Sequence, residues 1–189
     1  MAGGRARRFG GRDKSTLVVE GRTILERQLE ELSRLTTDIL LVGGGGAVPG
    51  ARRIPDRLPG RGPLGGVFTA LAEARGEATI VIACDMPFVT APFLAHLLSL
   101  TGEADLVVPR TRRGYHPLCA AYTPRCVPAA AARLAEGRLK MTGLFEDVRM
   151  RVVEADEIEL FGDPDRLLAN VNTPDDQRRL DDVPDDARP

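Results

Sequence analysis

The sequence predicts an α/β protein: a three-layer α/β/α sandwich built on a mostly parallel, Rossmann-like sheet. Three observations lead to this fold class. Short apolar runs of strand length alternate with longer stretches of helical periodicity, which is the rhythm of βαβ units. The apolar runs contain few polar interruptions, as expected for strands that helices cover on both faces. The chain has 189 residues, 43% hydrophobic and 28% charged, which fits one globular domain with a real core.

The first half of the chain predicts two helix and strand pairs. Residues 23–35 carry apolar side chains at positions 24, 25, 29, 32 and 35, close to helical spacing. Residues 38–42 form an apolar run that ends in four glycines, 43–46, and this predicts a buried strand. Proline 63 then opens a predicted helix. The elements that follow in this half are a helix over 63–75, a strand over 79–83 and a helix over 91–100.

The second half predicts further strands and a looser pattern. Strands are expected over 105–109, 118–122 and 151–154, with a helix over 128–136 between the last two. We expect a single domain over 1–180. Residues 181–189 are acidic and rich in proline, which is typical of a disordered tail.

Composition excludes several classes of protein. The net charge of −1 argues against a nonspecific nucleic-acid binder, which needs a large basic surplus. No apolar run approaches the length of a membrane span, and the arginine-rich start lacks the apolar region of a secretory signal. The three cysteines are odd in number and lack Cys-x-x-Cys spacing, so neither a disulfide framework nor a zinc site is indicated. We expect a cytoplasmic protein without membrane or nucleic-acid partners.

A glycine-rich and basic loop occupies residues 2–14. Glycines such as Gly3 and Gly4 let backbone amides approach phosphate oxygens and form an anion-binding nest. Arg8 and Lys14 add positive charge, and Lys14 is notable because 24 of the 26 basic residues are arginine. A flexible ammonium group suits a moving phosphate better than a planar guanidinium does. The alternative is a flexible arginine-rich tail, and the loop lacks the Gly-Lys-Ser/Thr of a Walker A motif.

Asp85 is the best single candidate for chemistry. It follows the most apolar predicted strand, where ligands of open parallel sheets bind, and a carboxylate there can hold Mg²⁺. The alternative role is a turn or helix-capping aspartate ahead of Pro87. Asn170 and Asn172 are the only asparagines in the chain, and the amide oxygen of Asn172 could share the metal. Asn172 could instead cap a helix that begins at Pro174.

Six motifs in order make the chain resemble the molybdenum cofactor guanylyltransferase family, the MobA-like branch of the nucleotidyltransferases. They are Ala-Gly-Gly-x-x-x-Arg-x-Gly-Gly-x-Asp-Lys at 2–14, Pro-Asp at 55–56, Gly-Pro-Leu-Gly-Gly at 62–66, Cys-Asp-Met-Pro-Phe at 84–88, His-Pro-Leu at 116–118 and Asn-Val-Asn-Thr-Pro-Asp at 170–175. Each motif is weak alone, but together they span nearly the whole chain.

The resemblance implies transfer of GMP from GTP to the terminal phosphate of molybdopterin, with or without its molybdenum, and release of pyrophosphate. Gly3, Gly4 and Lys14 are then expected to hold the GTP phosphates, Asp56 to lie beside the guanosine, and Asp85 to bind Mg²⁺. Arg8 and Lys14 would stabilise charge on the leaving group. Ala2 opens an Ala-Gly-Gly sequence where the related cytidylyltransferases usually have Ala-Ala-Gly, and this favours guanine.

The run at 110–116 follows the last clear strand and is rich in arginine. Arg112 and Arg113 are expected to collect the anionic phosphate of the pterin, with His116 as a further donor; the alternative for the arginines is a solvated basic turn. A structural hydrogen bond is the competing role for His116. His96 lies within a predicted helix and is expected to be a surface or structurally satisfied residue.

Two departures from the family pattern keep other functions open. The family often has an asparagine near the base where this chain has Gly43 and Gly44, and the family's first apolar strand, which leads into Ala-Gly-Gly, is absent ahead of Ala2. We expect a misplaced start or a truncation. The alternatives are a CTP-dependent molybdopterin cytidylyltransferase, a transferase for a phosphorylated acid such as phospholactate, and an inactive nucleotide-binding paralogue. A molybdoenzyme chaperone is a partner expected from the family alone.

Overall fold

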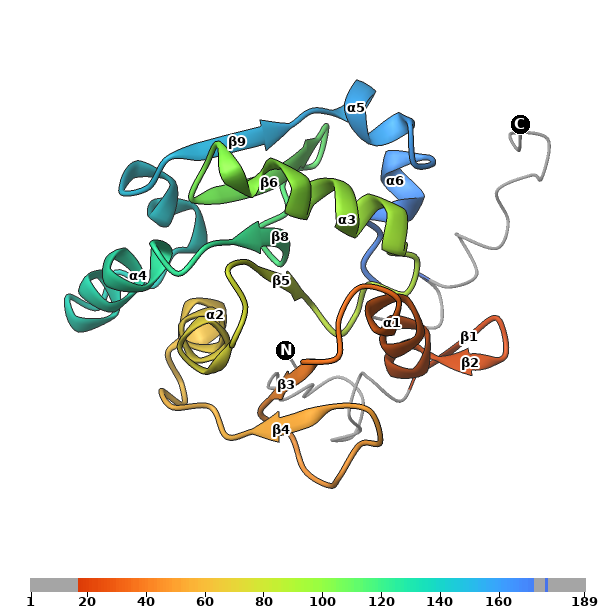
Figure 1. The fold of residues 1–189 in the computed structure, drawn as a ribbon, viewed down its shortest axis with the longest axis horizontal. Coiled ribbons are helices and arrows are strands. Elements are labelled where there is room, and N and C mark those ends of the chain that lie inside the picture. Colours follow the sequence, from red (N-terminus) through yellow and green to blue (C-terminus); the bar gives the residue numbers. More distant parts are fainter. Residues whose placement is uncertain (1–16, 172–175, 177–189) are drawn as a thin grey trace.

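The computed structural model describes residues 17–171 and residue 176, and Figure 1 shows its fold. The described part of the chain begins with β1 (Val18–Val19), β2 (Arg22–Thr23), α1 (Ile24–Ser33), β3 (Leu40–Val42) and β4 (Arg52–Ile54). The elements that follow are α2 (Gly62–Glu73), β5 (Thr79–Ile82), α3 (Ala91–Ser99), η2 (Leu100–Gly102), β6 (Leu106–Thr111), β7 (Gly114–Tyr115), β8 (Cys119–Tyr122), α4 (Cys126–Ala135), η3 (Met141–Glu146), β9 (Met150–Val153), α5 (Ala155–Glu159) and α6 (Pro164–Leu167).

The main sheet is mixed, and its direction places three strand ends at one edge. Its strands follow the order β5-β8-β6-β7, and β9 also pairs with β6. β8 is antiparallel to both β5 and β6, whereas β9 is parallel to β6. β5, β6 and β9 therefore run in the same direction. Their carboxyl ends share the edge at which open α/β sheets bind ligands.

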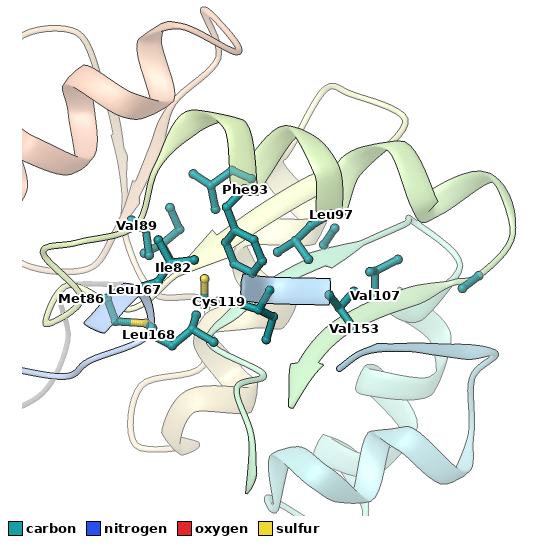
Figure 2. Close-up of a cluster of buried hydrophobic side chains, with 14 residues drawn as sticks. Ile82, Met86, Val89, Phe93, Leu97, Val107, Cys119, Val153, Leu167 and Leu168 are labelled. Atoms are coloured by element: carbon teal, nitrogen blue, oxygen red, sulfur yellow. The ribbon is translucent and has the colours of Figure 1, made fainter. Parts of the chain in front are cut away.

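Helices cover the main sheet on both faces, as the unbroken apolar runs predict. α3 lies on one side of β5, β8 and β6, and α2 and α4 lie on the other (Figure 1). Along β6, Val107 belongs to the α3 side while Leu106 and Val108 belong to the α2 side. Figure 2 shows Phe93 reaching from α3 into the cluster that includes Cys119. The two apolar clusters and the sheet between them form the expected three-layer sandwich.

A smaller sheet stands apart from the main one. β3 and β4 pair in parallel, with Leu41 opposite Arg53, and α2 packs against both β3 and β5. A cavity of about 340 Å³ lies between the two sheets. It is lined mainly by aliphatic side chains of α1, β3 and β5, which include Leu25, Leu29, Leu32, Leu40, Leu41, Val42, Ile80, Val81 and Ile82. Among the residues that the structure describes, no strand lies between β3 and β5.

Each predicted helix and strand is confirmed, with ends shifted by at most two residues. The predictions omitted the β1–β2 hairpin, β4, β7, the 3-10 helices η2 and η3, and the two short helices α5 and α6. The predicted tail at 181–189 lies outside the described residues. None of the described helices is both long and apolar enough to span a bilayer.

Candidate active site

The described residues contain five of the predicted site residues: Asp56, Asp85, Arg112, Arg113 and His116. The other predicted site residues, Ala2, Gly3, Gly4, Arg8, Lys14 and Asn172, lie outside the described residues. The geometry of the site is therefore built from the carboxyl ends of β4, β5 and β6, and from the segments that hold those ends in place.

Asp85 lies in a loop that two distant segments hold in position. Gln28, buried on α1, donates through Nε2 to the carbonyl oxygens of Ala83 at 2.7 Å and Met86 at 2.9 Å. The backbone N–H of Val171 donates to the carbonyl oxygen of Asp85 at 2.7 Å. Asp85 itself is half-buried. Because its backbone is held from both sides, its carboxylate is presented at a fixed place at the carboxyl edge of the main sheet.

Asp56 follows β4 and organises the turn that leads into α2. Its Oδ1 accepts a hydrogen bond from the backbone N–H of Leu58 at 2.9 Å and lies 3.2 Å from the hydroxyl of Thr69. Thr69 is fully buried, and its hydroxyl is also 2.9 Å from the carbonyl oxygen of Gly65. One oxygen of Asp56 is thus engaged in holding the turn. The predicted contact of Asp56 with guanosine remains a prediction.

Within the Gly-Pro-Leu-Gly-Gly motif, the structure explains why Gly65 is a glycine. A Cβ built on this glycine would lie 3.0 Å from Cβ of Arg61 and 3.1 Å from the carbonyl oxygen of Leu58. The turn after Asp56 therefore approaches the first turn of α2 so closely that only glycine fits without displacing a neighbour. Pro63 stands within the first turn of the helix, where a missing N–H costs little.

The hairpin between β6 and β7 brings the predicted arginines together. Arg112 and Arg113 lie at its tip, and the N–H of Arg113 donates to the Thr111 hydroxyl at 3.1 Å. His116 Nε2 lies 2.9 Å from that hydroxyl. Burial lowers the pKa of His116, and the neighbouring Arg113 guanidinium lowers it further, while Asp165 opposes the shift.

The hairpin and Asp85 lie at the same edge of the sheet and are joined by main-chain hydrogen bonds. The N–H of Ala83, two residues before Asp85, donates to the carbonyl oxygen of Leu118 at 2.7 Å. The N–H of His116, two residues before Leu118, donates to the carbonyl oxygen of Pro109 at 2.9 Å. The sheet itself therefore fixes the relation between the carboxylate and the arginine hairpin.

Sequence reasoning missed two residues that shape this edge. Gln28 holds the Asp85 loop, and Asp165 on α6 forms ion pairs with both Arg112 and Arg113. Each interaction joins residues more than fifty positions apart, and neither residue belongs to a local motif. Only the folded chain shows these partners.

An anchored carboxylate and an arginine-rich hairpin at the carboxyl edge of an α/β sheet are the kinds of groups with which α/β proteins bind phosphate esters. The comparisons specify the class. The chain belongs to the MobA-like NTP transferase domain family, whose model matches residues 1–150. By this membership it is a nucleotidyltransferase.

Relatives of known name agree with this assignment. The chain is 31% identical to a probable molybdenum cofactor guanylyltransferase of Pelotomaculum thermopropionicum over 93% of this chain and 87% of that protein. It is 30% identical to the molybdenum cofactor guanylyltransferase of Desulfosudis oleivorans over 92% and 88% of the two chains. The solved structure of molybdopterin-guanine dinucleotide biosynthesis protein A from Archaeoglobus fulgidus is similar with a TM-score of 0.80 and 26% identity, covering 95% of this chain and 93% of that one.

Proposed function

We propose that this protein transfers GMP from GTP to the terminal phosphate of molybdopterin or its molybdenum-loaded form, giving molybdopterin guanine dinucleotide and pyrophosphate. The relatives named as guanylyltransferases, similar over more than 90% of this chain, support the reaction. The observation that carries the proposal in this structure is the shared edge of Asp85 and the arginine hairpin. That edge offers a place for a metal-bound triphosphate beside a place for an acceptor phosphate.

The reaction needs alignment and charge neutralisation more than covalent help. The acceptor phosphate is ionised near neutral pH, so it can attack the α-phosphorus of GTP without a strong general base. Arg112 and Arg113 orient this phosphate, and Gly3, Gly4 and Lys14 hold the triphosphate. Arg8 and Lys14 stabilise the negative charge that grows on pyrophosphate as it leaves. No covalent enzyme intermediate is required.

Asp85 fits the role of a magnesium ligand by its chemistry and position. Mg²⁺ commonly takes one or two protein carboxylates and completes its shell with water and substrate phosphates, so a single half-buried carboxylate at this edge is a suitable anchor. The bound ion would neutralise charge on the phosphate oxygens. Asn172 is the proposed second ligand. A Mycobacterium tuberculosis protein of the same fold, 22% identical, has a structure determined in complex with manganese.

Guanine is the proposed base, and the reaction is assigned to the cytoplasm. Ala2 supports guanine through the resemblance, and Asp56 is proposed to lie beside the guanosine. A molybdoenzyme chaperone that receives the product is the proposed protein partner. A CTP-dependent cytidylyltransferase and an inactive nucleotide-binding paralogue are the outcomes against which the proposal is tested.

Thermal unfolding with each nucleotide tests the proposal at the level of binding. GTP with Mg²⁺ is expected to raise the melting temperature by about 5–10 °C at a hundredfold excess over Kd, because that excess is worth about 2.7 kcal/mol. ATP, CTP, and GTP without Mg²⁺ are expected to have a much smaller effect. Asp85→Asn removes most of the GTP shift, whereas Asp156→Asn, an exposed aspartate on α5, preserves it.

Each outcome of this experiment has a definite meaning. A shift specific to CTP would assign the chain to the cytidylyltransferases. A shift that Asp85→Asn leaves intact would remove Asp85 from the metal site. The absence of a shift with every nucleotide would argue against nucleotide binding, and therefore against both the transferase and the nucleotide-binding paralogue.

A further inference from the structure

Asp165 places a carboxylate between the two arginines at the tip of the β6–β7 hairpin. Its Oδ2 is bonded to Nη2 of Arg112, and its Oδ1 lies 3.5 Å from Nε of Arg113. The Asp165 side chain is only 19% exposed, whereas those of Arg112 and Arg113 are 82% and 61% exposed. A single internal anion therefore stands where two solvent-exposed guanidinium groups converge.

The carboxylate is fixed to the body of the protein by its helix. Asp163 caps α6 by accepting a hydrogen bond from the backbone N–H of Asp165 at 3.0 Å. After α6 the chain continues to Val171, whose N–H binds the backbone of Asp85. Asp165 thus belongs to the same short segment that holds the proposed metal ligand, and it approaches the hairpin from that side.

Other charged groups around the hairpin are engaged elsewhere. Arg110 pairs with Glu154 at 2.5 Å, and Arg166 pairs with Glu20 at 2.7 Å and stacks on Phe88. Burial and the Arg113 guanidinium lower the pKa of His116. Asp165 is therefore the carboxylate that the described residues offer to Arg112 and Arg113.

The fit between Asp165 and the arginines is incomplete. Asp165 Oδ1 is buried and has no hydrogen-bond partner among the described residues, because its 3.5 Å separation from Arg113 is an ion-pair distance rather than a good hydrogen bond. Two guanidinium groups carry two positive charges, and one carboxylate balances only one of them. A phosphate monoester with two negative charges and three terminal oxygens matches the pair better.

We infer that Asp165 is an internal counter-ion that competes with anions for Arg112 and Arg113 at the acceptor site. The exposed guanidinium groups of the two arginines leave the fixed carboxylate and bind the terminal phosphate of a monoester in its place. A monoanion that displaced Asp165 would only substitute one single charge for another. A dianion completes the charge balance and is favoured. The inference rests on the proposed function, in which the acceptor is such a monoester.

Titration with inorganic phosphate, followed by ³¹P NMR, tests the inference on the full chain without GTP. Asp165→Asn is expected to tighten phosphate binding by about two- to fivefold, the range expected for one partly exposed charge pair. It is also expected to tighten acetate binding, but by a smaller factor, because the Asp165 charge repels a dianion more strongly than a monoanion. Glu159→Gln, which removes the same charge from an exposed position on α5, is the matched control and leaves both affinities unchanged.

Further variants separate this role from a merely structural one. Asp165→Glu keeps the charge and is expected to keep the ratio of phosphate to acetate affinity close to that of the wild-type chain. Replacing both Arg112 and Arg113 by alanine abolishes the response to Asp165→Asn. Weaker or unchanged phosphate binding in a folded Asp165→Asn variant would overturn the inference, and so would an unchanged ratio of phosphate to acetate affinity.

An assay of guanylyl transfer by the wild-type chain distinguishes failure of the counter-ion role from failure of the proposed reaction. If GMP transfer occurs but Asp165→Asn leaves the anion preference unchanged, the counter-ion role is wrong and the function stands. If the anion preference changes as expected but no nucleotide is transferred, the counter-ion role stands and the proposed reaction is wrong.

Discussion

At the scale of single residues, the protonation of His116 makes the stability of the folded chain depend on pH. Burial and the Arg113 guanidinium hold its pKa below the ordinary value of 6.5, so the unfolded chain binds a proton that the folded chain resists. As pH falls from above 6.5 toward the lowered pKa, the free energy of unfolding decreases. Below the lowered pKa the contribution no longer changes.

His116→Asn is therefore expected to flatten the acid side of the stability profile. Urea unfolding at a series of pH values between about 7.5 and 5 would measure the effect. The wild-type chain should lose more stability than the variant over this interval. A wild-type profile that is as flat as that of the variant, or one that rises toward acid, would contradict the lowered pKa.

At the scale of elements, the start of α2 depends on a close approach at Gly65. Gly65→Ala places a methyl group against Cβ of Arg61 and the carbonyl oxygen of Leu58, both of which belong to a turn held by Asp56. Overpacking of this kind costs typically about 1–3 kcal/mol, which exceeds the gain in helix propensity from alanine of about 1 kcal/mol.

We expect Gly65→Ala to lower the free energy of unfolding by up to about 2 kcal/mol, the difference between these two effects. Equilibrium denaturation measures the change. Gly102→Ala is the control, because nothing lies within 4 Å of its added Cβ. Equal stability of the two variants would mean that the turn yields and that the close approach is not essential.

The elements also show where sequence reasoning succeeds and where it stops. Long apolar runs such as residues 79–82 identify their strands, because burial on both faces leaves a strong local pattern. β4 reads Arg-Arg-Ile, and it is a strand only because it pairs with β3 while Arg52 reaches Asp38 at 3.2 Å and the carbonyl oxygen of Glu73 at 3.0 Å. α5 and α6 are too short to show helical periodicity.

The residues of the candidate site also fall into two groups, those that the sequence predicts and those that only the folded structure identifies. Asp85, the arginines and His116 follow predicted strands, so the rule that ligands bind at carboxyl strand ends was sufficient to select them. Gln28 and Asp165 act on those residues from distant parts of the chain, and the sequence contains no local signal for such contacts. The glycine-rich loop lies outside the described residues and stays a prediction.

At the scale of the whole molecule, the cavity between the two sheets is the most consequential feature. The edges of β3 and β5 flank about 340 Å³ of mainly aliphatic lining, which a short extended apolar segment would fill while pairing with both strands. Each fully buried large apolar side chain contributes about 1.5–3 kcal/mol. A strand in this place would therefore stabilise the fold strongly.

Adding an apolar segment to the chain tests whether the cavity can accept a strand. Five β-branched residues joined ahead of residue 1 are expected to raise the melting temperature by several degrees, because about 1 kcal/mol corresponds to 2–4 °C in a protein of this size. A glycine and serine segment of equal length is the control and should have no effect. Equal melting temperatures for the two extensions would show that the cavity does not accept a strand.

Turnover is the most direct measure of GMP transfer to the pterin phosphate. Purified protein would be incubated with Mg²⁺, molybdopterin and either GTP or CTP, and the dinucleotide and pyrophosphate would be quantified by chromatography. We predict a guanine dinucleotide and an equal amount of pyrophosphate with GTP, little product with CTP, and a large loss of product with Asp85→Asn. Guanylyl transfer by this protein would be contradicted by product from CTP in preference to GTP, or by the absence of pyrophosphate from a chain that binds GTP.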